Sequence, residues 1–127
     1  MGADCSQNLS GQELARAPEW NASSSVSYTR PLLDNYEWTV SLDLIYSDSY
    51  FADVDLDDNT QQDDYTMLNA RIALGAISDD WQLALRGTNL TDETVMTGTV
   101  DLPFTRGAYG ARILAPRSYF LDLKASF

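Results

Sequence analysis

The sequence predicts an all-β protein, built as an antiparallel up-and-down meander of about five long strands. Apolar and polar residues alternate with a period of two in five stretches, and no window shows a competing helical period. The connections between these stretches alternate between short and long, as expected when each strand returns beside the one before it. The expected strands are Glu19 to Arg30, Tyr36 to Tyr50, Tyr65 to Ile77, Trp81 to Asn89 and Pro116 to Phe127.

The first expected strand has the weakest alternation, and the next three repeat it more clearly. Along the first, Trp20, Ala22, Val26 and Tyr28 oppose polar residues. Side chains in a strand point alternately to its two faces, so each of these strands should have one apolar face and one polar face. The apolar faces of the second, third and fourth strands are Trp38, Val40, Leu42 and Leu44, then Leu68, Ile72 and Leu74, then Trp81, Leu83 and Leu85.

The last expected strand alternates to the end of the sequence. Its apolar face holds Tyr119, Leu121, Leu123 and Phe127, and only Phe120 breaks the pattern. Roughly ten residues is what a tilted strand needs to cross a bilayer. The polar faces carry Asp43, Arg71, Arg86, Asp122 and Lys124, which are expected to pair across strands and stabilise the sheet.

The connections differ by their position in the meander. Pro31 to Asn35 and Ser78 to Asp80 read as tight hairpin turns, whereas Ala52 to Asp64 and Leu90 to Pro116 read as long, irregular loops. Short turns at one end of the strands and long loops at the other are typical of outer-membrane barrels.

Aromatic residues are expected to form two belts, one at each end of the strands. Amphipathic rings that bracket an aliphatic band are favoured at a membrane interface, although aromatics are also common at strand ends in any sheet. The expected turn-end belt is Tyr28, Tyr36, Trp38, Trp81 and Phe127, and the expected loop-end belt is Tyr46, Tyr50, Tyr65 and Tyr119.

The first long loop is a candidate cation site. Asp53, Asp55, Asp57 and Asp64 occupy positions 1, 3, 5 and 12 of an EF-hand-like spacing. Asp58 stands where that loop needs glycine, and flanking strands replace the helices, so a solvated acidic cap is the competing interpretation. No other cofactor is expected.

Composition restricts the other function classes. The net charge of −11 and the absence of lysine or arginine stripes exclude nucleic acid as an expected partner. No acid, base and nucleophile converge, and the absence of histidine removes histidine-based zinc sites and triads, so the chain is not expected to be an enzyme. Cys5 is expected to be a solvated thiol in a polar leader, residues 1–18, ahead of the strand region, residues 19–127.

Several segments together resemble the carboxy-terminal end of a TonB-dependent outer-membrane receptor. The most specific are Asn89-Leu90-Thr91-Asp92-Glu93 and the pair Pro116-Arg117 that enters a strand ending on Phe127. The order and spacing of three further segments are similar to those of the same family: Gly11 to Trp20, Tyr65 to Asn69 and Trp81 to Glu93. The resemblance implies that these are the last five strands of a barrel of about 22. The plug domain and the rest of the barrel are not included.

The resemblance also implies a location, partners and a role. It places the protein in the outer membrane of a Gram-negative bacterium, where such receptors take up a scarce large solute, such as an iron chelate. The barrel-assembly machinery would contact the strand that ends on Phe127, and the inner-membrane energy coupler would act only through the missing plug. The isolated chain is therefore not expected to transport.

An open sheet with an apolar face and two free edges would aggregate unless these were covered. We therefore expect the apolar face to become an interior in the isolated chain, by closure into a small barrel or by self-association. The alternative function from the residues alone is a soluble β-barrel or sandwich that binds a ligand or calcium, with the apolar faces turned inward. Stability without detergent would favour this alternative.

Overall fold

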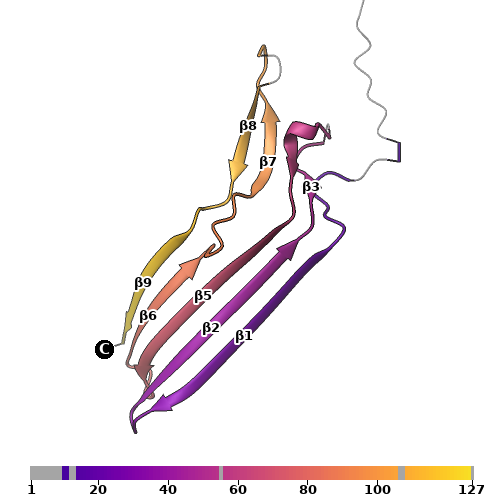
Figure 1. Ribbon diagram of the computed structural model, residues 1–127. Helices are drawn as coiled ribbons and strands as arrows, with labels where there is room; N and C mark the ends of the chain where they lie inside the picture. Colours follow the sequence, from indigo (N-terminus) through magenta and orange to yellow (C-terminus); the bar gives the residue numbers. More distant parts are fainter. Residues whose placement is uncertain (1–9, 12–13, 55, 106–107, 127) are drawn as a thin grey trace, which may run out of the picture.

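The computed structural model describes residues 10–11, 14–54, 56–105 and 108–126, and its main feature is one antiparallel sheet (Figure 1). The strands lie in the order β1–β2–β5–β6–β9, which is their order along the chain. Their bounds are Asn21–Leu32, Tyr36–Ser47, Tyr65–Ala76, Trp81–Thr88 and Ser118–Ala125. The five-stranded meander predicted from the alternation is therefore confirmed.

Two short hairpins extend from one end of this sheet, where long irregular loops were expected. The first consists of β3 (Tyr50–Phe51) and β4 (Gln61–Gln62), with the 3₁₀ helix η1 (Asp58–Thr60) between them. The second pairs β7 (Met96–Asp101) with β8 (Tyr109–Ile113). Strands of two residues are too short for a periodic signal, and a register irregularity between Met96 and Gly98 interrupts the alternation of β7.

The register places the apolar side chains of neighbouring strands in rows. Val40, Ile72, Leu85 and Leu121 are successive partners across β2, β5, β6 and β9. The next row contains Trp38, Leu74, Leu83 and Leu123. Because side chains on one face of a sheet are spaced by two residues, these rows form one continuous apolar surface.

The opposite face is polar, and its contacts change across the sheet. Between β1 and β2 short hydroxyl groups pair directly, with Ser27 Oγ 3.0 Å from Ser41 Oγ and Thr29 Oγ1 2.9 Å from Thr39 Oγ1. In the next row, Ser25 Oγ donates to Asp43 Oδ1 at 2.6 Å. These cross-strand hydrogen bonds give β1 a polar ladder although it is an edge strand.

Longer side chains cover the polar face between β5 and β9. Arg71 donates to Gln82 Oε1 at 2.6 Å, and this bond runs diagonally across the Ala73–Ala84 pair, which is almost fully buried. Arg86 lies 3.4 Å from Asp122, so the expected pairing of these charges is confirmed. The Arg86 guanidinium also lies over the Phe120 ring, at 4.4 Å, which gives the one aromatic residue out of pattern a partner on this face.

The turn end of the sheet, residues 33–35 and 77–80, is compact. The first turn is shorter than expected, because Pro31 and Leu32 still belong to β1. An edge strand can contain proline, since the missing N–H faces away from its neighbour. Leu33 and Asp79 have positive φ angles of 62° and 61°, and the two turns are joined by a 2.9 Å bond from Ile77 N to the carbonyl of Asn35.

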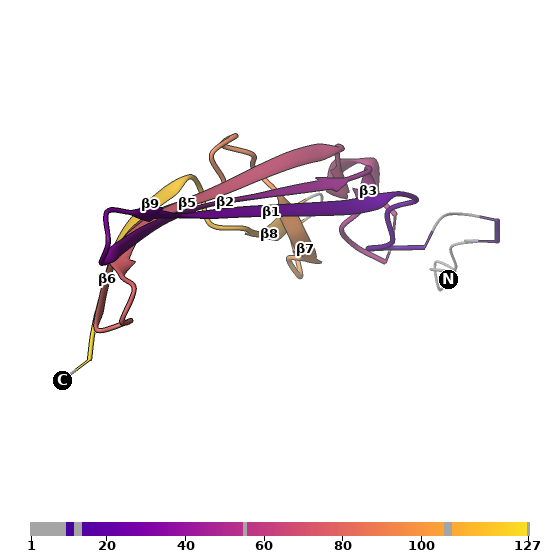
Figure 2. The same cartoon turned by 90° about the horizontal axis from the view of Figure 1, so that it is seen from below.

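The sheet is open, so the expected closure of the isolated chain into a small barrel is wrong. Figure 2 shows the sheet nearly edge-on as a thin, bowed layer, and β1 and β9 form its two edges. Leu85, Leu121 and Leu123 on the apolar face are 50%, 72% and 74% exposed. The bow of five strands is too shallow to bring the edge strands together. The structure holds a single copy, so packing against a second copy stays a prediction.

Candidate functional site

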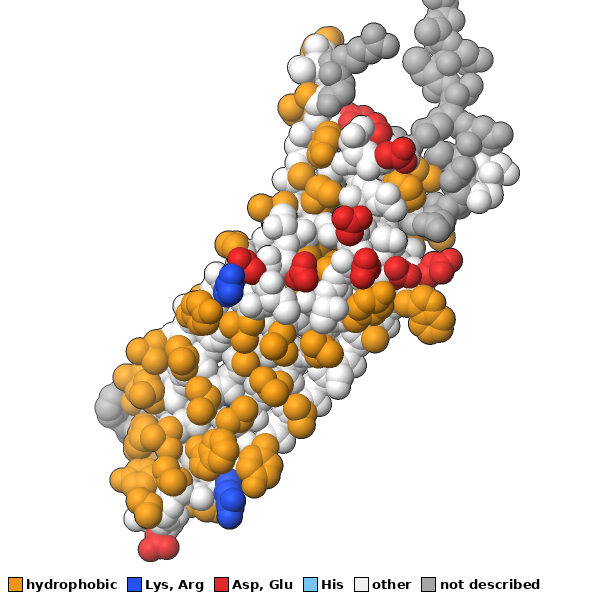
Figure 3. Space-filling view, viewed as in Figure 1, with side chains coloured by type: hydrophobic (Ala, Val, Ile, Leu, Met, Phe, Trp, Pro, Cys, Tyr) orange, Lys and Arg blue, Asp and Glu red, His pale blue; other side chains and the backbone are white. Residues whose placement is uncertain are grey.

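The main candidate site is the apolar face of the five-stranded sheet. Figure 3 shows apolar side chains gathered over the sheet, and acidic side chains in a row beside its loop end. Of the residues predicted for this apolar face, only Phe127 lies outside the described part of the chain. The apolar face is defined here by Trp38, Val40, Leu42, Leu44, Leu68, Ile72, Leu74, Trp81, Leu83, Leu85, Tyr119, Leu121 and Leu123.

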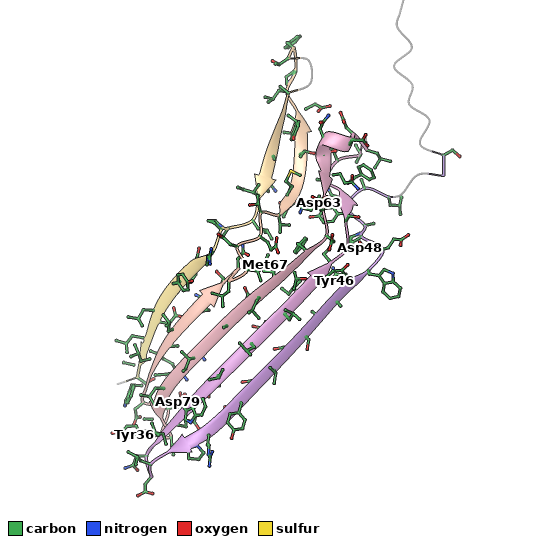
Figure 4. The ribbon with its side chains drawn as sticks, in the orientation of Figure 1. Tyr36, Tyr46, Asp48, Asp63, Met67 and Asp79 are labelled. Carbon is green, nitrogen blue, oxygen red and sulfur yellow. The ribbon has the colours of Figure 1, made fainter. Side chains whose placement is uncertain are left out.

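The height of this face is set by β2. Tyr36 lies at the turn end of this strand and Tyr46 at its loop end (Figure 4). Their ten-residue separation corresponds to roughly 33 Å along a strand at about 3.3 Å per residue. A strand tilted by about 40° would reduce this to roughly 25 Å, the height of the apolar band of a membrane barrel.

Aromatic rings meet at the turn end of the apolar face. The centroids of Tyr28 and Trp38 are 5.9 Å apart in an edge-to-face arrangement. Tyr36 and Trp81 join β2 to β6 with centroids 6.0 Å apart. Such pairs contribute about 0.5–1.5 kcal/mol beyond their buried area. The turn-end belt is thus a set of paired rings across strands.

The loop-end belt is thinner than the sequence predicted. Tyr46 and Tyr119 lie on the apolar face, but Tyr65 is the register partner of Ser47 and points to the opposite face. Tyr50 lies outside the sheet, in β3, where its hydroxyl donates to the carbonyl of Met96 at 2.7 Å. Partial burial raises the pKa of Tyr50 above its usual value, with a smaller contribution from Tyr65. Tyr50 therefore joins two loops and is not part of a belt.

Two carboxylates of the acidic loop, those of Asp53 and Asp57, accept hydrogen bonds from nearby backbone N–H groups. Asp57 Oδ1 accepts from the backbone of Asn59 at 3.1 Å and caps η1. Asp53 accepts from Val54 N at 2.7 Å. Within residues 10–11, 14–54, 56–105 and 108–126, no group of three or more acidic, cysteine or histidine side chains is placed to hold a metal. Asp55 lies outside this part, so calcium binding through Asp53, Asp55, Asp57 and Asp64 stays a prediction.

The loop end of the sheet, residues 48–64 and 89–117, is held together by hydrogen bonds between its loops. Gln62, which is almost fully buried, accepts from Met96 N at 2.6 Å, and Thr99 donates to Asp53 Oδ2 at 3.2 Å. The ion pairs printed for the described residues join Arg86 to Asp122, Arg117 to Asp92 and Lys124 to Asp79.

The turn after β6 is organised by Asn89. This residue has a positive φ of 52° and is 2% exposed. Its side-chain amide both accepts and donates hydrogen bonds. Oδ1 accepts from Glu93 N at 2.9 Å, while Nδ2 donates to the carbonyls of Glu93 and Ala115 at 2.8 and 3.2 Å. Asparagine tolerates this left-handed conformation better than other non-glycine residues. Asn89 thus connects the end of β6 to the approach of β9.

A charged contact lies beside the Asn89 turn. Arg117 donates to Asp92 Oδ2 at 2.5 Å, and this bond raises the pKa of Arg117 above its usual value. The two segments that carried the family resemblance, 89–93 and 116–117, are therefore in contact through Asp92 and Arg117. Both segments were recognised from the sequence. Their contact could not be predicted, because 22 residues separate them along the chain.

Together these features define a class of protein: a wall of an antiparallel barrel with one apolar face, one polar face, short turns at one end and structured loops at the other. A family model described as TonB dependent receptor-like, beta-barrel matches residues 4–90, more than half of the chain. The chain belongs to this family. No curated protein and no solved structure matched it. The described residues contain no helix that is long and apolar enough to cross a membrane.

Proposed function

We propose that this chain is a segment of the wall of an outer-membrane receptor for the active uptake of a scarce large solute, such as an iron chelate, in a Gram-negative bacterium. The observation that carries the proposal is the unbroken apolar face, which is exposed along four strands and backed by a polar face. In a barrel with this arrangement, the apolar face contacts lipid and the polar face lines the lumen.

The rest of the machinery lies in parts of the receptor beyond this chain. A plug would fill the lumen and link it to the inner-membrane energy coupler, and the barrel-assembly machinery would act on the terminal strand. Because the chain supplies only wall, we expect it neither to transport a solute nor to catalyse a reaction. Its two free edges, β1 and β9, would pair with the neighbouring strands of the complete barrel and would promote self-association without them.

Vesicle flotation tests the membrane assignment. The chain is refolded from urea in the presence of phosphatidylcholine vesicles and centrifuged through a density gradient at low and high salt. We expect it to float with the vesicles at both salt concentrations, because apolar contact with lipid is insensitive to screening. Far-ultraviolet circular dichroism should show β-structure in the floated fraction.

Two variants of identical charge provide the control. Leu85→Lys places a charge in the centre of the apolar face and should strongly reduce flotation, whereas Thr39→Lys on the polar face should float like the unchanged chain. A chain that stays folded and monomeric in buffer without detergent, and does not float, would contradict the proposal.

A further inference from the structure

The β7–β8 hairpin at the loop end has a hollow along one side that the membrane-wall role does not use. Its volume is about 540 Å³, within the range of small-molecule sites. Small residues form much of its floor, and an arginine from each of two distant segments lines it. The lining includes Arg16, Gly98, Thr99, Gly110, Ala111 and Arg112.

Arg16 is held at the hollow by its own backbone and side chain. Its N–H donates to the carbonyl of Phe51 at 2.8 Å, and its Nε donates to the carbonyl of Ala52 at 3.1 Å. These bonds leave its terminal nitrogens beside β7, where a Cβ added at Gly98 would lie 3.4 Å from Nη2. The absence of a side chain at Gly98 therefore makes room for the guanidinium.

Arg112 reaches the same side of the hairpin from the neighbouring strand. It is the register partner of Gly98, and side chains of directly opposed residues lie on one face. The hollow thus has a guanidinium from a segment before the sheet and another from β8. Both side chains are exposed, so a solute can reach them.

The charges around the hollow are unusual for a chain of net charge −11. In the described residues the three ion pairs use Arg86, Arg117 and Lys124, and neither Arg16 nor Arg112 is paired. One acidic group contacts the lining: Asp53 Oδ2 accepts from Thr99, and Asp53 Oδ1 accepts from Val54 N. The hollow therefore presents two guanidiniums next to one carboxylate whose oxygens are engaged.

We propose that this hollow binds an oxyanion group, carboxylate or phosphate, of the solute that the receptor takes up. Guanidinium forks bind both groups in bidentate geometry, and two of them favour a solute with more than one negative charge. A hollow of this size admits one anionic end of a large solute and not the whole of it. The identification of the ligand as cargo depends on the proposed receptor function, whereas the anion site itself does not.

Calorimetric titration of the refolded chain in detergent at low salt tests the site, with citrate as the carboxylate probe and inorganic phosphate as the second. We expect saturable binding of at least one probe, weakened about tenfold or more in Arg112→Gln and in Arg16→Gln, since each variant removes charge-assisted hydrogen bonds to the anion. Asp53→Asn should tighten binding several-fold by removing the adjacent negative charge. Arg30→Gln, at the turn end, should leave it unchanged.

The outcomes of the titration identify the preferred anion or overturn the proposed site. Binding of citrate alone or phosphate alone identifies the group that the hollow prefers. The proposal would be overturned if Arg16→Gln and Arg112→Gln bound the probes as tightly as the unchanged chain does. It would also be overturned if the unchanged chain gave only heats of dilution while circular dichroism showed an intact sheet. Flotation of the same protein with vesicles is scored separately, so a failed anion site and a failed membrane wall give distinguishable results.

Discussion

The five-stranded sheet and the loop end of this molecule are stabilised in different ways. In the sheet, rows of side chains such as Val40, Ile72, Leu85 and Leu121 repeat the same apolar contact across neighbouring strands. At the loop end, single polar side chains such as Asn89, Gln62 and Tyr50 each make contacts that no neighbour repeats. The sheet therefore depends on a pattern, and the loop end depends on individual residues.

This difference determines how each region should respond to substitution. A conservative apolar change in the sheet removes part of one row, and the neighbouring rows still define the register. Loss of a buried amide at the loop end leaves several backbone groups without partners at once. The sheet should consequently tolerate changes that preserve polarity, and the loop end should tolerate few changes at its connecting residues.

The largest expected effect comes from placing a charged side chain on the apolar face of the sheet. Ile72→Lys places a charge at the middle of the apolar face and should lower the free energy of unfolding in lipid by about 2–4 kcal/mol. Urea titration in phosphatidylcholine vesicles, followed by tryptophan fluorescence, measures it. Ile72→Val is the control, with an expected loss of about 0.5–1.5 kcal/mol. Equal losses in the two variants would show that lipid does not cover this face.

The next effect concerns Asn89. Asn89→Ala removes the bonds to Glu93 and Ala115 and places alanine at positive φ, so we expect a loss of about 2–4 kcal/mol in the same titration. Asn89→Gly keeps the backbone conformation accessible but also lacks the amide, and it should recover only part of the loss. Asn35→Ala, in an exposed turn, should change the free energy of unfolding by less than about 0.5 kcal/mol.

A smaller effect is expected from two glycines. At Gly75 an added Cβ would lie 3.0 Å from the carbonyl oxygen of Trp81, whereas at Gly110 its nearest neighbour is a Val100 methyl carbon at 3.7 Å. A backbone carbonyl in a sheet ladder cannot move as freely as a side chain, so Gly75→Ala should lose about 1–2 kcal/mol. Gly110→Ala should be neutral within about 0.5 kcal/mol. The reverse order would contradict the close strand packing at Gly75.

The smallest effect should come from the ion pair of Asp92 and Arg117. Both side chains are substantially exposed, at 51% and 42%, and exposed pairs contribute only about 0–1 kcal/mol. Asp92→Asn should therefore lose less than about 1 kcal/mol at low salt, and this loss should shrink further in 0.5 M sodium chloride. A loss that is large and independent of salt would show that the pair helps to organise the Asn89 turn.

The sequence predicted the sheet well because a half-buried strand has a period of two that can be read residue by residue. It predicted the five strands and the faces of Trp38, Leu85 and Leu123. Tyr65 was expected in the loop-end belt but lies on the polar face, because an aromatic residue at a strand end fits either side of the alternation.

The loop end was predicted poorly because its contacts have no period. Tyr50 and Met96 are 46 residues apart, and Asn89 reaches Ala115 across the whole β7–β8 hairpin. The two-residue strands β3 and β4 depend on these contacts and carry no signal of their own. The expected closure of the sheet failed for another reason: the sequence indicates which face is apolar but not how strongly five strands curve.

The most direct test of the account measures accessibility along β5, residues 66–74, with nitroxide labels at single cysteines introduced into a Cys5→Ser background in lipid. We predict that the accessibility of the labels alternates along β5 with a period of two residues. Labels at Leu68, Ala70, Ile72 and Leu74 should collide mainly with oxygen dissolved in the bilayer, and labels at Asn69, Arg71 and Ala73 mainly with a water-soluble nickel complex. Uniform accessibility along β5, or the opposite phase, would contradict the assignment of the apolar face to lipid.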